Sequence, residues 1–263
     1  MTTAVANYPL RDSTTMVRRN LKRMVRYPSM TVQLIAMPIL LLLLFVYVFG
    51  GTLGAGLGGP SGGRGEYINY VVPAILLMTI ATTVQGTAIS VAMDMTEGII
   101  ARFRTMNIAR ISVLTGHVIG SLIQALLGIA VVIGVALLIG FEPRTSFGGW
   151  IALVGLLVAV TFALVWLTVA IGQASQNVEA ASSLPMPLMF LPFVGSGFVP
   201  TDSMPGGLRW FAAHQPFTPI MESIRALLMD KPLGNDLWIA LAWCAGIALL
   251  GYAWAKKLYN RKA

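Results

Sequence analysis

Six long stretches of the chain contain no charged residue and are rich in aliphatic side chains. A membrane-spanning helix needs about 20 apolar residues to cross a hydrocarbon core of roughly 30 Å, and each stretch has about that length. The pattern therefore predicts an all-α membrane protein with six transmembrane helices. These cover residues 29–49, 67–93, 114–139, 150–171, 181–199 and 237–255.

The overall composition agrees with this pattern. The chain is 56% apolar and only 11% charged, with a mean hydropathy of +0.77, whereas soluble domains carry about 25% charged residues. A charged side chain at the centre of a membrane helix costs about 2.5 to 3.5 kcal/mol, which explains why the charges lie in the connecting segments. A water-soluble fold is excluded.

The distribution of basic residues predicts the orientation. Of 18 lysines and arginines, 13 lie in residues 1–28, the connector around 102–110 and residues 256–263. Because basic loops stay on the cytoplasmic side, both termini are expected there. Residues 1–28 then form a basic segment and 256–263 a basic tail, on either side of a single transmembrane domain, 29–255. The net charge of +8 indicates contact with lipid headgroups and not with nucleic acid.

The N-terminal segment has the periodicity of an amphipathic helix between a cap at Asp12 or Ser13 and a stop at Pro28. Its apolar positions are Val17, Leu21, Met24 and Val25, and its basic positions include Arg18, Arg19, Lys22 and Arg23. Such a helix is expected to lie in the membrane surface. It either anchors the topology or also contacts a partner.

The connector at 94–110 is a candidate docking element. Asp94 and Glu97 have the spacing of a capping box, and the helix that follows would carry an apolar stripe beside basic residues. The stripe is Ile99, Phe103 and Met106, and the basic residues are Arg102 and Arg104. The alternative is a helix that simply lies against the bilayer.

The second predicted span carries small and hydroxylated residues on one face. They are Thr79, Thr83, Gly86, Thr87 and Ser90, with Thr82 and Gln85 nearby. This face either lines a substrate path or packs closely against other helices, since interhelical hydrogen bonds contribute about 0.6 to 2 kcal/mol each.

The fifth predicted span contains three prolines and two glycines within 185–197. Each proline removes a backbone donor, so we expect a kinked helix, and broken helices are common in the moving parts of transporters. Phe190 and Phe193 of this span are further candidates for the path. The apolar connector 200–236, which is rich in proline, predicts two short helices that enter the outer leaflet.

The sequence offers little for catalysis or for ion coupling. No acidic or basic residue other than His117 lies within the predicted spans, whereas ion-coupled carriers usually keep such groups inside the membrane. Two histidines and one cysteine, without ligand spacing, predict no metal site. These features favour a passive pathway that is moved by another protein.

Three segments carry a resemblance to a known family. They read STTMVRRNLKRMVRYPS, EGIIARFRTMNIAR and LPFVGSGFVPTDSMPGGLRWFAAHQPFTPIMESIRALL. The chain resembles the permease subunit of a type-2 ATP-binding-cassette exporter, in particular the daunorubicin-resistance B-subunit branch. The resemblance covers nearly the whole chain.

The resemblance implies a function. Residues 94–107 would be the coupling helix that docks on an ATPase, and 205–229 would be re-entrant external helices. The path would lie at a dimer interface lined by spans 1, 2 and 5. Two permease copies, identical or different, would work with two separate ATPase subunits, which bind the ATP and Mg²⁺, in the bacterial inner membrane. This chain contains no Walker motif and is expected not to be an enzyme.

The function expected is therefore the export of amphipathic drugs, antibiotics or lipids. The alternatives are a non-transport membrane scaffold or assembly component and, among exporters, a permease for glycans or glycolipids.

Overall fold

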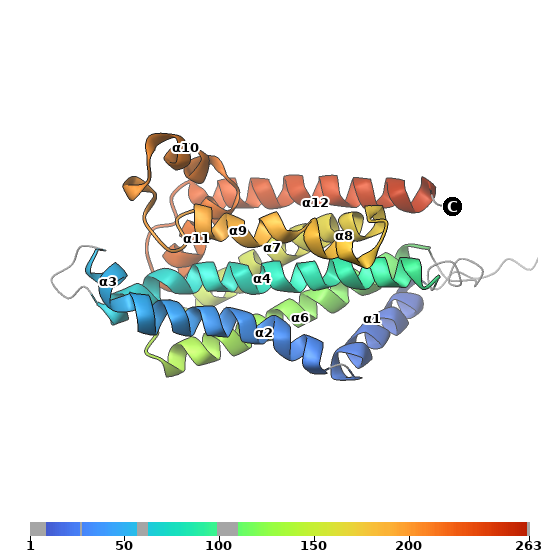
Figure 1. Cartoon of the computed structure of the whole chain (residues 1–263), viewed down its shortest axis with the longest axis horizontal. Helices are drawn as coiled ribbons and strands as arrows, with labels where there is room; N and C mark the ends of the chain where they lie inside the picture. The colour runs from blue at the N-terminus through green and yellow to red at the C-terminus, as the bar shows by residue number, and fades with distance from the viewer. Residues whose placement is uncertain (1–8, 27, 57–62, 99–109, 262–263) are drawn as a thin grey trace, which may run out of the picture.

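The computed structural model describes residues 9–26, 28–56, 63–98 and 110–261. In these ranges every regular element is helical. The long helices run side by side along the long axis of the molecule (Figure 1). This arrangement agrees with the predicted all-α class.

Five helices are long and apolar enough to cross a membrane. The first is continuous through α2 (Pro28–Leu43), a π-helical segment (Leu44–Phe49) and α3 (Gly50–Ala55). The other four are α4 (Arg64–Thr96), α6 (Arg110–Leu138), α7 (Phe147–Ala174) and α12 (Asp236–Arg261). They coincide with five of the six predicted spans.

The first span is longer than the sequence pattern predicted. The predicted span ended at residue 49, but the chain stays helical through Ala55. A Cβ atom at Gly54 would lie only 2.3 Å from the carbonyl oxygen of Gly63. The glycines therefore allow the end of α3 to pack against the backbone that leads into α4, which keeps this segment helical.

The fifth predicted span is divided into two short helices. These are α8 (Val178–Ser183) and α9 (Met186–Val194), with the break at Leu184 and Pro185. Pro185 and Pro187 have no backbone N–H to continue the helical hydrogen bonds, so the predicted break is confirmed.

Helix α4 is the central element of the bundle. In its most apolar stretch of 18 residues, 89% of the residues are buried. In the corresponding stretches of the first span and of α12, only 17% are buried. It contacts α2, α6, α7, α8, α9 and α11. Small residues allow this packing, because a Cβ at Gly172 of α7 would lie only 2.6 Å from the carbonyl oxygen of Ala88.

The connector before α12 contains two short helices, as expected, α10 (Gly206–His214) and α11 (Phe217–Leu228). They lie with α3 at one end of the bundle (Figure 1). The buried Arg225 of α11 donates to the carbonyl oxygens of Ser196 at 2.9 Å and Tyr70 at 3.2 Å. Its guanidinium also lies 4.0 Å from the centre of the Tyr70 ring. Together with the Tyr70 hydroxyl at 2.8 Å, Arg225 thus satisfies the Ser196 carbonyl beyond the end of α9.

The N-terminal helix α1 (Pro9–Arg26) lies at the other end of the bundle, the end at which α12 finishes (Figure 1). It begins before the expected cap at Asp12 or Ser13. It packs against α6, where a Cβ at Gly116 would lie 2.4 Å from Met16 Cβ and one at Gly120 would lie 2.9 Å from Asn20 Cβ. These glycines let α1 approach the α6 backbone closely.

Candidate functional site

Three ionisable side chains from three helices meet at the C-terminal end of α4. The Asp94 carboxylate accepts two hydrogen bonds from the Arg19 guanidinium of α1, at 3.0 and 3.1 Å. Its Oδ2 also lies 3.1 Å from Nε2 of His117 on α6. The side chains of Asp94 and His117 are only 2% and 4% exposed, whereas Arg19 is 34% exposed. We call these three residues the charge cluster.

The charge cluster corrects two expectations for Asp94. The residue lies in the last turn of α4 and does not cap a new helix; Glu97 follows as an exposed C-terminal cap residue. Asp94 was also expected in an exposed connector after the second span, whereas its side chain is only 2% exposed. The physical reason is tertiary, because Arg19 supplies positive charge and two hydrogen bonds, and His117 a further polar contact, to a carboxylate that could not otherwise be buried. The rest of the predicted docking element (Ile99, Arg102, Phe103 and Arg104) lies outside the described residues.

The basic face of α1 is divided by this contact. Arg18 and Lys22 are exposed at the surface, as a membrane-surface helix requires. Arg19, grouped with them from the sequence, turns inward to Asp94. The side chain of Arg23 is outside the described part of the structure.

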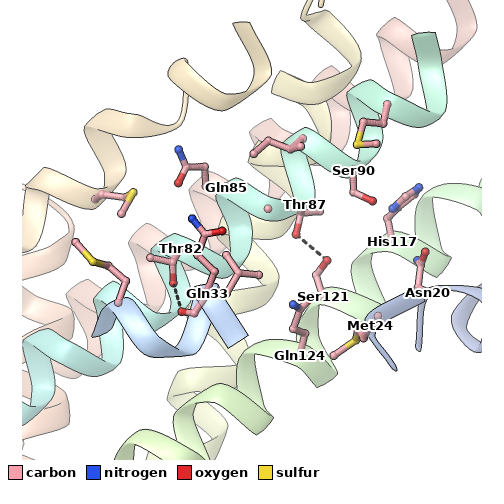
Figure 2. Close-up of a pocket in the computed structure, with 17 residues that line it drawn as sticks. Asn20, Met24, Gln33, Thr82, Gln85, Thr87, Ser90, His117, Ser121 and Gln124 are labelled. Carbon is pink, nitrogen blue, oxygen red and sulfur yellow. Dashed lines mark hydrogen bonds between the residues drawn. The ribbon is translucent and has the colours of Figure 1, made fainter. Parts of the chain in front are cut away.

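A cavity of about 410 Å³ lies beside the charge cluster. Its walls come from α1, α2, α4, α6 and α9, and we call it the polar cavity (Figure 2). Apolar side chains such as Met24, Met37 and Met189 form part of the wall. Its polar lining consists of Asn20, Gln33, Thr82, Gln85, Thr87, Ser90, His117, Ser121 and Gln124.

The structure separates the predicted polar stripe of α4 into two groups. Gln85, Thr87 and Ser90 line the polar cavity. Thr79 and Thr83 do not; they are buried between helices, and their hydroxyls donate to backbone carbonyls one turn earlier, at 2.8 and 2.9 Å. Thr79 and Thr83 of the stripe therefore pack between helices, and Gln85, Thr87 and Ser90 form part of a cavity wall.

Polar contacts connect the walls of the cavity. The hydroxyls of Thr87 and Ser121 lie 2.7 Å apart and join α4 to α6. Gln85 Nε2 donates to the carbonyl oxygen of Ser182 at 2.7 Å. This second bond fixes the cavity wall to α8 immediately before the break in the fifth span.

The two phenylalanines predicted for the path lie on α9, outside the polar cavity. Phe190 is exposed. Phe193 stacks on Phe198 with ring centroids 4.5 Å apart, and Phe45 of the first span lies 4.3 Å from Phe198. These aromatic contacts hold the segment after α9 against the first span.

The structure is a bundle of apolar helices with one broken span. The sequence of this chain also matches a known family. The sequence profile of the ABC-2 type transporter family matches residues 12–229. The chain belongs to this family. ABC-2 permeases are membrane transport components, and ATP is hydrolysed by a separate ATPase subunit, as expected from the sequence.

Two relatives of this ABC-2 permease have names that refer to drug resistance, and a third is named as a member of the G family. The daunorubicin resistance ABC transporter permease protein DrrB1 of Streptomyces coeruleorubidus is 24% identical over 237 residues, 90% of this chain and 81% of the relative. The probable doxorubicin resistance permease DrrC of Mycobacterium tuberculosis is 27% identical over 183 residues, 68% of this chain and 65% of the relative. The ABC transporter G family member 20 of Dictyostelium discoideum is 26% identical over 68% of this chain, but over only 25% of its own length.

Sequence reasoning did not find the contact between α1 and α6 in this permease. A signal was present, because Gly116 and Gly120 form a G-x-x-x-G pattern of the kind that lets membrane helices approach closely. The charge cluster had no such signal, since Arg19 lies 75 positions before Asp94.

Proposed function

We propose that this chain is the permease subunit of an ATP-driven exporter that moves amphipathic molecules out of the bacterial cell. The observation that carries the proposal is the match to the ABC-2 family over residues 12–229. Relatives named for daunorubicin and doxorubicin resistance support amphipathic drugs as cargo. In this proposal the end of the bundle that holds α1 and the charge cluster faces the cytoplasm.

The segment from Asp94 to Arg104 is the proposed contact with the ATPase. It begins in the last turn of α4, and α4 is the helix that contacts most of the others. The charge cluster supports this role, because it attaches the start of the segment to both α1 and α6. A displacement of the segment is therefore transmitted to three helices.

Two copies of the permease and two copies of the ATPase make up the proposed exporter. The first span and α9 present large apolar side chains at the surface, among them Leu40, Val48 and Phe190. These residues suit a contact with the second permease copy or with lipid. In the proposal, α8 and α9 together form the fifth of six membrane spans, in addition to the five long helices. Helices α10 and α11 are the proposed re-entrant external helices.

Purification of the chain in mild detergent from its native host tests the proposal. We expect an ATPase to copurify at about one copy per permease, with ATP hydrolysis in the complex. A folded permease that purifies without any ATPase would contradict the exporter and favour a scaffold.

Replacement of Glu97 and Phe103 together tests the coupling segment. We expect the double variant to insert normally and bind its ATPase more weakly, so that hydrolysis no longer drives transport. The control is Glu142→Ala with Phe147→Ala, which removes the same side chains from the connector between α6 and α7 and the first turn of α7. Normal coupling in the Glu97 and Phe103 variant would exclude this docking assignment.

A further inference from the structure

The lining of the polar cavity has an unusual charge balance for a drug-binding site. It includes eight hydroxyl and amide side chains, but none of its described lining residues is acidic. His117 is the titratable residue on its wall, and its Nε2 is held by Asp94. Asp94 itself is not on the wall.

Asp94 does not supply a counter-charge for a bound cation. Its Oδ1 accepts from Arg19, and its Oδ2 lies within hydrogen-bond distance of both Arg19 and His117. An ammonium group in the cavity would therefore lose its water without gaining an anionic partner, which costs several kcal/mol. Arg18 and Lys22, the exposed cations of α1, do not line the cavity, but α1 forms part of its wall.

The cavity does offer hydrogen bonds to an uncharged ligand. Among the described residues, the side-chain amides of Gln33 on α2 and Gln124 on α6 have no hydrogen-bond partner, and both lie at the cavity in Figure 2. Each amide provides both donors and an acceptor. Neutral carbonyl, hydroxyl or amide groups match them without the cost of burying a charge.

The size and position of the cavity fit an amphipathic small molecule. Its volume of about 410 Å³ is within the range of roughly 300 to 1,000 Å³ that is typical of drug-sized ligands. The cavity lies along the second half of α4, from Thr82 to Met93. Gln33 and Met37 on α2 are exposed at the molecular surface, where a molecule in the surrounding membrane leaflet has access.

We propose that the polar cavity is a binding site within each permease for an uncharged amphipathic molecule, and that it discriminates against cations. The ligand's polar groups hydrogen-bond to Gln33 and Gln124, and its apolar part contacts the methionines. As a place where uncharged cargo is taken up from the cytoplasmic leaflet, the site rests on the proposed function, and a drug with a protonated amine, such as daunorubicin, is not its ligand. Selective binding of a ligand at this site does not require an ATPase.

The test uses two dyes that have nearly identical shapes but differ in charge. Nile red is neutral, and Nile blue carries an iminium cation in place of the Nile red carbonyl. Binding is measured with the full chain, without ATPase, in nanodiscs of phosphatidylcholine, and the signal of empty nanodiscs is subtracted. We expect Nile red to bind at least about tenfold more tightly, a difference of roughly 1.4 kcal/mol.

Two variants locate the site. Gly86→Leu fills the cavity, because a Cβ at Gly86 would make an ordinary 3.4 Å contact with Leu34 and the remaining atoms would occupy the free space. Its matched control is Gly246→Leu on α12, where nothing lies within 4 Å. We expect Gly86→Leu to lose Nile red binding and Gly246→Leu to retain it.

Gln124→Glu tests the charge argument directly. A carboxylate on the wall is expected to reverse the preference, so that Nile blue binds more tightly than Nile red. An unchanged preference in this variant, equal binding of both dyes to the unmodified chain, or full Nile red binding by Gly86→Leu would overturn the proposal. If Gly86→Leu fails to fold, Gln124→Glu decides alone. Selective binding without a copurifying ATPase would support the site while contradicting the exporter.

Discussion

Removal of the Asp94 carboxylate is the sharpest test of the charge cluster. In Asp94→Ala, the guanidinium of Arg19 loses both of its bonds to the carboxylate, and Nε2 of His117 loses its partner at 3.1 Å. We expect α1 and α6 to be held less firmly at the end of α4 and the folded chain to be less stable.

The structure gives the size of the effect. Breaking a buried ion pair by removing one partner costs about 3 to 5 kcal/mol. His117 is left behind at 4% exposure, but Arg19 is 34% exposed and can turn its guanidinium to water. The lower limit, about 3 kcal/mol, therefore applies. For a domain of this size, that loss lowers the melting midpoint by roughly 6 to 12 °C.

The assay is the melting midpoint of the purified chain in mild detergent. The control is Asp202→Ala, which removes a carboxylate from a second aspartate–arginine pair, with Arg209. That pair is 79% and 55% exposed, and an exposed pair contributes about 0 to 1 kcal/mol. A midpoint for Asp94→Ala equal to that of Asp202→Ala would refute the view that burial makes the charge cluster strong.

Two further substitutions test contacts that hold the ends of the bundle. Arg225→Gln should destabilise the chain by about 1.5 to 3 kcal/mol, because the carbonyl of Ser196 loses its charged donor and keeps only the Tyr70 hydroxyl, while Glu222 loses its ionic partner; a midpoint shift below about 2 °C would contradict this. Gly116→Ala should cost about 1 to 3 kcal/mol through the clash with Met16 and should increase proteolysis of α1. Gly134→Ala on the same helix, where nothing lies within 4 Å, is its control and should leave both measurements unchanged or improved.

The transmembrane helices were predictable because burial in lipid imposes a strong local requirement. Uncharged stretches of sufficient length gave five spans directly, and the prolines gave the break between α8 and α9. The end of the first span was not predictable. Its glycines are weak helix formers in isolation, and they remain helical because Gly54 contacts the chain at Gly63.

The candidate site was predictable only in part, because its main features depend on residues that are distant in the sequence. The stripe on α4 indicated Gln85, Thr87 and Ser90, which do line the polar cavity. The local pattern at Asp94 and Glu97 matched a capping box, yet Asp94 belongs to the preceding helix. No local pattern could show that Arg19 would neutralise it there or that His117 would contact it.

The contacts along α4 suggest which part of the polar cavity yields first when the end of α4 is displaced. Helix α1 is fixed to α6 independently of Asp94, because Asn20 Nδ2 donates to the carbonyl oxygen of Gly116 at 2.8 Å. The charge cluster therefore attaches α4 to a pair of helices by several charge-assisted bonds. On the other side of the cavity, a neutral hydrogen bond joins Gln85 to Ser182, and such a bond contributes only about 0.5 to 1.5 kcal/mol. A force on the end of α4 should consequently separate α4 from α8 before it separates α4 from α1 and α6, so that the cavity opens toward the broken span.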